Sequence, residues 1–302
     1  MLMPNKIPMQ FAALSLFLFA FLCVTATAQS VAAQTPQTPG SGISLAPARV
    51  EMEMRPGTEA TVVIDLDYHA AVEAQPVRIV ASLSDWTLNR NGEVEFQKAN
   101  TFSNSASGWI IYSPAETTVT PGNTHSIRVT ISVPKDATPG DHLSALIVEQ
   151  RPDTIKLIQN RRQMVVRYRM ASVFYIKVLE LTRRGLLANL HAEARADGVV
   201  ITPTLQNQGN SAIRPLASVR ITNAAGQIVA QSAEKELLPV LAGAELAKPI
   251  IIENVLPPGS YTVKYHVDFQ DGSRPTEGVT DLVVANAVAA ANSRNGGPPL
   301  KP

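Results

Sequence analysis

Histidine is the side chain most often used for acid–base catalysis and metal binding near neutral pH, and this chain has five of them. No two are closely spaced: they stand at His69, His125, His142, His191 and His266. The tight polar cluster is Asp65–His69, where Asp65, Asp67 and His69 would share one face of a strand. Two carboxylates and an imidazole could hold a metal ion, but a solvent-facing strand needs the same residues without any ligand. We favour the second interpretation.

Covalent and acid–base catalysis have no further support in the sequence. No Ser, Thr or Cys stands in a nucleophile elbow, and no glycine-rich loop resembles a phosphate cradle. Asp and Glu residues are scattered, without a pair that suggests a general acid and base. We therefore expect a protein that is not an enzyme and that needs neither a cofactor nor a metal.

The first residues predict export. Lys6 precedes an apolar run over residues 11–24, and Ala26-Thr27-Ala28 fits a small-residue cleavage site. We expect residues 1–28 to be a signal peptide and the protein to be periplasmic, with no membrane insertion of the mature chain. An uncleaved anchor is the alternative, disfavoured because the apolar core is short. Cleavage would remove Cys23, the sole cysteine, and with it any disulfide or thiolate site.

Charge argues against a nucleic-acid partner. The chain has 26 Lys and Arg against 25 Asp and Glu, so removal of Lys6 with the signal peptide leaves 25 of each. Arg161, Arg162, Arg167 and Arg169 form a local excess. They could bind phosphate, but a solvated strand edge explains them as well, and we favour it.

The elements that would position these residues are strands. Within Trp109–Arg151, two Pro-Gly pairs separate alternating segments. Ile127, Val129 and Ile131 alternate with polar residues in a half-buried antiparallel pattern. Strands of this kind are expected near residues 44–54, 58–69, 76–88, 93–97, 109–113, 124–133, 142–151 and 163–179. Such spacing predicts an all-β fold with an immunoglobulin-like sandwich.

A second β pattern follows the first. In Tyr261–Phe269, apolar and polar residues alternate, and Gly-containing turns separate neighbouring segments. We expect two immunoglobulin-like or fibronectin-like β-sandwich domains in tandem. The predicted divisions are a signal peptide at 1–28, a flexible leader at 29–42, a first domain at 43–182, a second at 183–286 and a disordered tail at 287–302.

The predicted strand at residues 163–179 is unusually long. Met164, Phe174 and Ile176 belong to a face that we expect to meet the core. The other face carries Val165 and Arg167, and an exposed edge here could accept a strand from another chain. Pairing of the whole strand inside its own sheet is equally compatible with the sequence.

Several of these segments resemble the periplasmic pilus-assembly chaperones of chaperone–usher systems. Ser44–Val50 resembles their first strand, and Ser113–Val129 their "P…PG…R(V/L)" segment. His142–Arg151 is similar to their sixth strand and Val173–Tyr175 to the end of their seventh. The resemblance covers residues 43–180.

The resemblance implies a chaperone that lends its seventh strand to a secreted pilin-like subunit and works with an outer-membrane usher. It places Arg49 where the family grips the subunit's terminal carboxylate. It also places Ser172 where the family has the lysine that grips the same carboxylate, a role in which Lys177 or Arg169 could substitute. Ile176 stands where the family has an interdomain arginine. The implied partner-binding residues are Arg49, Val165, Arg167, Arg169, Val173 and Lys177.

An alternative function stays open. Asn207–Asn210 and Pro257–Val263 also resemble segments of cell-surface proteins, which would make this chain a cell-surface or cell-wall binding module. Both functions are non-enzymatic, and they differ in whether the partner is a protein subunit or a wall polymer.

Overall fold

The structure is a computed structural model that describes residues 42–71, 74–151 and 168–285. These residues all fall in one compact unit of the chain, Gly40–Pro302. The predicted signal peptide, the leader before Gly42 and the tail lie outside the described residues, as do Val165 and Arg167 of the implied site.

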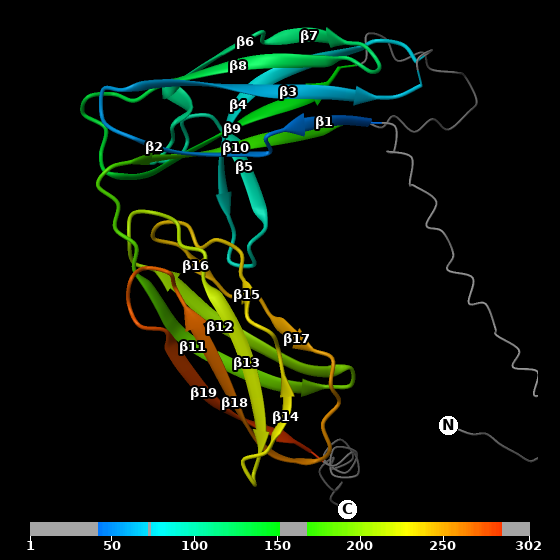
Figure 1. The fold of residues 1–302 in the computed structure, drawn as a ribbon, viewed down its shortest axis with the longest axis vertical. Helices are drawn as coiled ribbons and strands as arrows, with labels where there is room; N and C mark the ends of the chain where they lie inside the picture. Colours follow the sequence, from blue (N-terminus) through cyan, green and yellow to red (C-terminus); the bar gives the residue numbers. More distant parts are fainter. Residues whose placement is uncertain (1–41, 72–73, 152–167, 286–302) are drawn as a thin grey trace, which may run out of the picture. The chain divides into compact units, whose positions relative to one another are not determined.

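The all-β prediction is confirmed. The described residues form strands and one short 3₁₀-helix at Ser107–Trp109, and the strands make two β-sandwiches (Figure 1). Within the described ranges, no helix is long and apolar enough to cross a membrane.

The first sandwich packs two sheets against each other. Sheet A has the order β1 (Gly42–Ala46), β3 (Glu59–His69), β8 (Thr124–Ser132) and β6 (Ile110–Ser113). Sheet B has the order β2 (Arg49–Met54), β10 (Arg169–Val178), β9 (Gly140–Gln150), β4 (Val77–Leu88) and β5 (Val94–Lys98), with β7 (Glu116–Val119) also paired to β4. Alternation on β8 places Ile127, Val129 and Ile131 in the core between the sheets, as predicted.

One predicted strand is wrong. Residues 44–54 form two strands that belong to opposite sheets, because Pro47 interrupts the strand. Proline has no N–H with which to continue the ladder between β1 and β3. After the break, β2 joins sheet B and pairs in parallel with β10. The short strand β7 was not predicted at all.

The second sandwich also has two sheets. Sheet C consists of β11 (Gly185–Arg195), β12 (Gly198–Asn207), β16 (Glu245–Leu246) and β17 (Ile250–Ile252), the last two both paired with β12. Sheet D has the order β14 (Ile228–Gln231), β13 (Leu216–Asn223), β18 (Gly259–Asp268) and β19 (Thr276–Val284), with β15 (Lys235–Glu236) also paired to β13. The predicted alternation on β18 is confirmed, since Val263, Tyr265 and Val267 are fully buried. The domain boundary at residues 182 and 183 stays a prediction.

The β4–β5 hairpin contacts the second sandwich. Its turn contains Gly92, whose φ of +79° suits glycine. A Cβ at this position would collide with Leu238 of the second sandwich. Arg90 accepts a hydrogen bond from the Ala247 N–H at 2.7 Å and forms an ion pair with Glu245 at 2.6 Å. The hairpin therefore lies directly against the loop that carries β16.

Candidate functional site

Strand β10 has two different sides. Along its whole described length it pairs with β9, from Arg169 with Glu149 to Val178 with Gly140. On the other side β2 pairs only from Val173 onward, because β2 begins at Arg49. Among the described residues, Arg169–Ser172 therefore have no ladder partner on the side that β2 occupies further along. We call this segment the open edge of β10.

The direction of the backbone groups follows from the ladder. The Gln150 N–H donates to the Tyr168 carbonyl at 2.9 Å, which makes this residue pair a hydrogen-bonded one. Such pairs alternate along an antiparallel ladder, so Met170 and Ser172 also point their backbone groups at β9. Arg169 and Ala171 then point theirs at the open edge. The Val173 N–H, next in this series, donates to the Ala48 carbonyl at 3.0 Å.

The interpretation of residues 163–179 as an exposed edge is wrong for Val173 and Lys177. Both are paired on both sides, with β9 and with β2, because the chain's own N-terminal strand supplies the neighbour. Their backbones are therefore not available to another chain. The expected core-facing side of the strand is confirmed at Phe174 and Ile176, which are fully buried.

Arg49 lies at the end of the open edge, opposite Val173. Its side chain is 56% exposed, and its Nε lies 3.2 Å from Oε1 of Glu51. Glu51 also forms ion pairs with Lys177, whose Nζ lies 2.8 Å from Oε2, and with Arg214 of the second sandwich, whose Nη2 lies 2.5 Å from Oε1. We call these four residues the Glu51 cluster. It places three cations around one carboxylate, with Lys177 the most buried of them.

The charges of the Glu51 cluster shift its acid–base properties. Burial raises the pKa of Glu51, but hydrogen bonds and charge from Lys177 and Arg214 outweigh it and hold this pKa below its ordinary value. Glu51 is therefore ionised at neutral pH. Lys177, predicted as a candidate for carboxylate capture, already holds a carboxylate of its own chain.

The outer face of sheet B beside the open edge is apolar. Trp86 and Tyr175 meet edge to face at 4.9 Å, and Arg214 lies over the Tyr175 ring at 5.6 Å. Arg169 lies over the ring of Phe96 at 5.9 Å. Apolar residues of the second sandwich, Ala212 and Leu241, complete this cluster. The open edge is thus bordered by apolar surface and by arginines.

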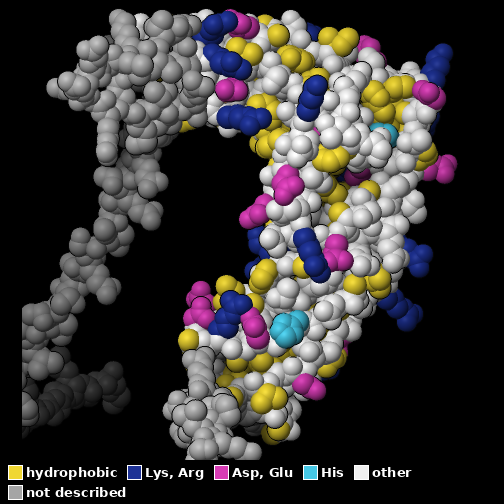
Figure 2. All heavy atoms as spheres, turned by 180° about the vertical axis from the view of Figure 1, so that it is seen from behind, with side chains coloured by type: hydrophobic (Ala, Val, Ile, Leu, Met, Phe, Trp, Pro, Cys, Tyr) yellow, Lys and Arg dark blue, Asp and Glu magenta, His cyan; other side chains and the backbone are white. Residues whose placement is uncertain are grey.

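The polar cluster Asp65–His69 makes cross-strand hydrogen bonds. Ser126 donates to Asp65 at 2.6 Å, and Ser44 Oγ lies 3.1 Å from His69 Nε2. No group of three or more His, Cys, Asp or Glu suited to a metal ion is found among the described residues. Figure 2 shows basic and acidic side chains interspersed over the visible face of these residues.

Two members of the Glu51 cluster were not identified from the sequence. Glu51 stands in the alternating segment Val50–Met54, and this pattern indicates only an outward-facing acid. Arg214 is 163 residues away in the chain and has no motif around it. The excess of cations over acids at the strand end could be recognised only after β2 and β10 were found to pair.

A scan against protein-family models and a search of curated proteins found no match for this chain. Solved structures do match. A chain from the chaperone–tip adhesin complex of CFA/I fimbriae is 12% identical, covers 81% of this chain and 100% of its own length, and has a TM-score of 0.43. The class 5 fimbriae chaperone CfaA is 11% identical, with 80% and 100% covered and a TM-score of 0.41. A chain of the SafA pilin–SafB chaperone complex from Salmonella enterica is 13% identical, with 79% and 96% covered and a TM-score of 0.40.

Proposed function

We propose that this protein is a periplasmic chaperone that binds secreted pilin-like subunits by adding a subunit strand to the open edge of β10. The observation that carries the proposal is the register of sheet B, in which β2 stops short of Arg169–Ser172. Unpaired strand edges are templates for another chain, because their N–H and C=O groups can complete a ladder.

The subunit strand would meet the backbone groups of Arg169 and Ala171. These are the residues whose N–H and C=O groups point away from β9. Side chains on the added strand would alternate between the core side, beside Met170, and the apolar outer face, beside Phe96. This alternation would select subunits with apolar residues at every second position.

The position of Arg49 favours a subunit strand that runs parallel to β10. Arg49 lies opposite Val173, at the end toward which β10 runs from Arg169. A subunit strand that ended there with its terminal carboxylate would run parallel to β10. A half-exposed guanidinium can bind such a carboxylate in a bidentate manner. The roles of Val165 and Arg167, and of an outer-membrane usher, belong to this proposal and rest on the resemblance.

The test is affinity capture of the tagged mature protein from its native periplasm, followed by mass spectrometry. We expect one-to-one complexes with small β-rich secreted subunits. Ala171→Pro removes an N–H that points at the open edge and leaves the ladder to β9 intact. A lost backbone bond and an unsatisfied partner carbonyl together cost about 1–3 kcal/mol, or roughly 5-fold to 150-fold in affinity.

Ala171→Ser is the matched control, since it keeps the N–H and should bind as well as the wild type. Capture of subunits at the wild-type level by Ala171→Pro would contradict strand addition at this edge. Recovery of the protein alone, or with wall polymer, would favour the surface-module alternative instead.

A further inference from the structure

The second sandwich has a cavity where its two sheets separate. On sheet C, β16 pairs with β12 at Leu205 and Gln206, and β17 pairs with it at Val199–Ile201. Thr202–Thr204 lie between these pairings without a partner on that edge among the described residues. On sheet D, β15 ends at Glu236, and the chain then loops across to β16. The seam between the two sheets holds a cavity of about 450 Å³ that is partly open to solvent.

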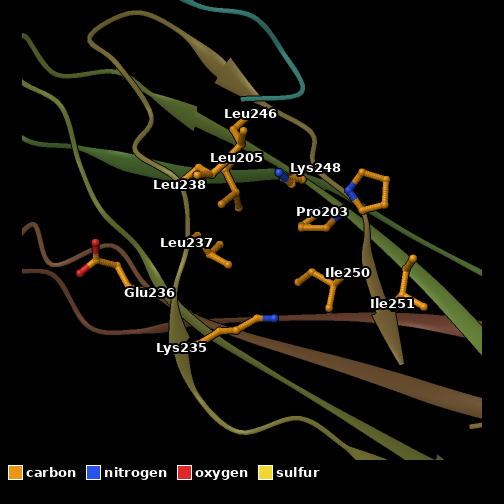
Figure 3. Close-up of a pocket in the computed structure, with 11 residues that line it drawn as sticks. Pro203, Leu205, Lys235, Glu236, Leu237, Leu238, Leu246, Lys248, Ile250 and Ile251 are labelled. Atoms are coloured by element: carbon orange, nitrogen blue, oxygen red, sulfur yellow. The ribbon is translucent and has the colours of Figure 1, made fainter. Parts of the chain in front are cut away.

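The walls of this seam cavity are mainly apolar. Leucine and isoleucine side chains come from sheet C and from the loop that follows β15, whereas sheet D contributes Lys235 and Glu236 (Figure 3). Leu205 and Leu246 are buried, whereas Ile251 is 56% exposed at the rim. Pro203 contributes no N–H to the unpaired stretch of β12, so this edge offers few backbone donors to an incoming strand. The cavity therefore suits an aliphatic group better than a peptide backbone.

Two lysines lie at the seam cavity. Lys235 and Lys248 both line it, and among the described residues neither ammonium group has an ion pair or a hydrogen bond. The one acidic lining residue is Glu236, whose carboxylate points away from the other lining residues in Figure 3. Lys235 extends toward Ile250 in the same view. Elsewhere, Lys177 and Lys264 each have a carboxylate within 3.1 Å.

We propose that the seam cavity binds a small amphipathic anion, with an aliphatic chain in the cavity and a carboxylate at its lysines. Its volume lies within the range of small-molecule sites, roughly 300–1,000 Å³. Lys235 and Lys248 both line the cavity, and their flexible four-carbon stems let an ammonium group adjust to the position of a bound anion. The apolar walls recover the free energy of removing the chain from water. This site lies on the second sandwich and does not depend on the open edge of β10.

Decanoate is the probe, with decanol as its neutral analogue and decyl phosphate as a second anion. Titration calorimetry on the mature protein should give a Kd of roughly 10–100 µM for decanoate. Decanol should bind at least about 5-fold more weakly. Methyl NMR signals of Leu237, Leu238 and Ile250 should shift on titration. If decyl phosphate binds and decanoate does not, the carboxylate assignment is wrong.

Two variants separate headgroup from chain. Lys235→Gln with Lys248→Gln should weaken decanoate about 10-fold and leave decanol unchanged. Lys98→Gln with Lys135→Gln, an equal change of charge on the first sandwich, should alter neither. Ile251→Ser, an exposed wall residue, should weaken both ligands a few-fold without affecting thermal unfolding. Absence of decanoate binding, or binding that the double variant does not weaken, would overturn the proposal.

Discussion

The open edge of β10 and the gap on the edge of β12 are both places where, among the described residues, a strand has no ladder partner on one side, yet they differ in what they offer. Beside β10, the missing neighbour exposes backbone groups of Arg169 and Ala171 next to apolar surface. Beside β12, the gap includes Pro203 and opens into a mainly apolar cavity that is partly open to solvent. The first edge can extend a ladder, whereas the second can hold a side chain or a small molecule.

The same contrast holds for the charges at the two sites. In the Glu51 cluster, Arg49, Lys177 and Arg214 share an internal carboxylate. At the seam cavity, two lysines have no such partner within the described residues. An anion arriving at β10 competes with Glu51 for its cations, whereas an anion arriving at the seam meets lysines that have no ion pair among the described residues. Open edges of similar length therefore lead to different binding chemistry.

The largest expected change in the free energy of unfolding tests whether the first residues of β10 pair with β9 alone. Ser172 points its backbone at β9, is fully buried, and donates its hydroxyl to the Pro47 carbonyl at 2.7 Å. Ser172→Pro removes a ladder bond and a buried hydroxyl, and should lower the free energy of unfolding by about 3 kcal/mol or more. Ala171→Pro, one residue earlier, should cost less than about 1 kcal/mol. Urea unfolding measures both, and equal costs at the two positions would contradict an open edge.

An intermediate effect is expected at the buried polar side chains Asp85, in the first sandwich, and Asn207, in the second. Asp85 accepts hydrogen bonds from the Ser105 and Ser107 hydroxyls and from the Thr101 and Phe102 N–H groups, at 2.5–2.9 Å. Burial raises the pKa of Asp85, but these donors outweigh it and hold the pKa below its ordinary value. In the second sandwich the neutral Asn207 donates to the Val240 carbonyl at 2.9 Å.

Asp85→Asn should therefore lower the free energy of unfolding by about 2 kcal/mol at pH 7. A lowered folded-state pKa stabilises the protein above the unfolded-state value of roughly 3.9, and this contribution is lost as the pH falls through the folded-state pKa. The difference between wild type and Asp85→Asn should shrink between pH 5 and pH 3. The cost of Asn207→Ala should not change over that range, and a parallel decline for both variants would argue against the charge of Asp85.

Local patterns were sufficient to predict most strands of the first sandwich and the long strand β18 of the second. The alternation in β8 and β18 identified buried faces that the structure confirms at Ile127, Val129 and Tyr265. The Asn91-Gly92 turn likewise lies where β4 meets β5. These features depend on residues that are neighbours in the chain, so their spacing carries the information.

The two sites depend on which distant strands pair with each other, and residue spacing within a segment does not predict that. The change of sheet at Pro47 decides which part of β10 is open, and it brings residues from the start of the chain beside Val173. The seam cavity exists because β16 and β17 are separate short strands on one edge of β12. Neither event follows from the composition of the segments involved, since both depend on which distant strand becomes a neighbour.

The smallest expected effect tests whether Glu51 occupies the cations near β10, in contrast to the lysines of the seam cavity. Glu51→Gln leaves Lys177, whose side chain is 12% exposed, without an ionised partner and should cost about 1 kcal/mol of unfolding free energy or less. The same change removes the internal competitor for Arg49, so subunit capture should become a few-fold tighter if Arg49 binds the terminal carboxylate. Glu53→Gln is the control, because Glu53 is 59% exposed and lies 3.9 Å from Arg183, and neither quantity should change. Capture that weakens with Glu51→Gln would mean that Glu51 positions Arg49 rather than competing for it, and the contrast with the unpartnered lysines of the seam cavity would no longer hold.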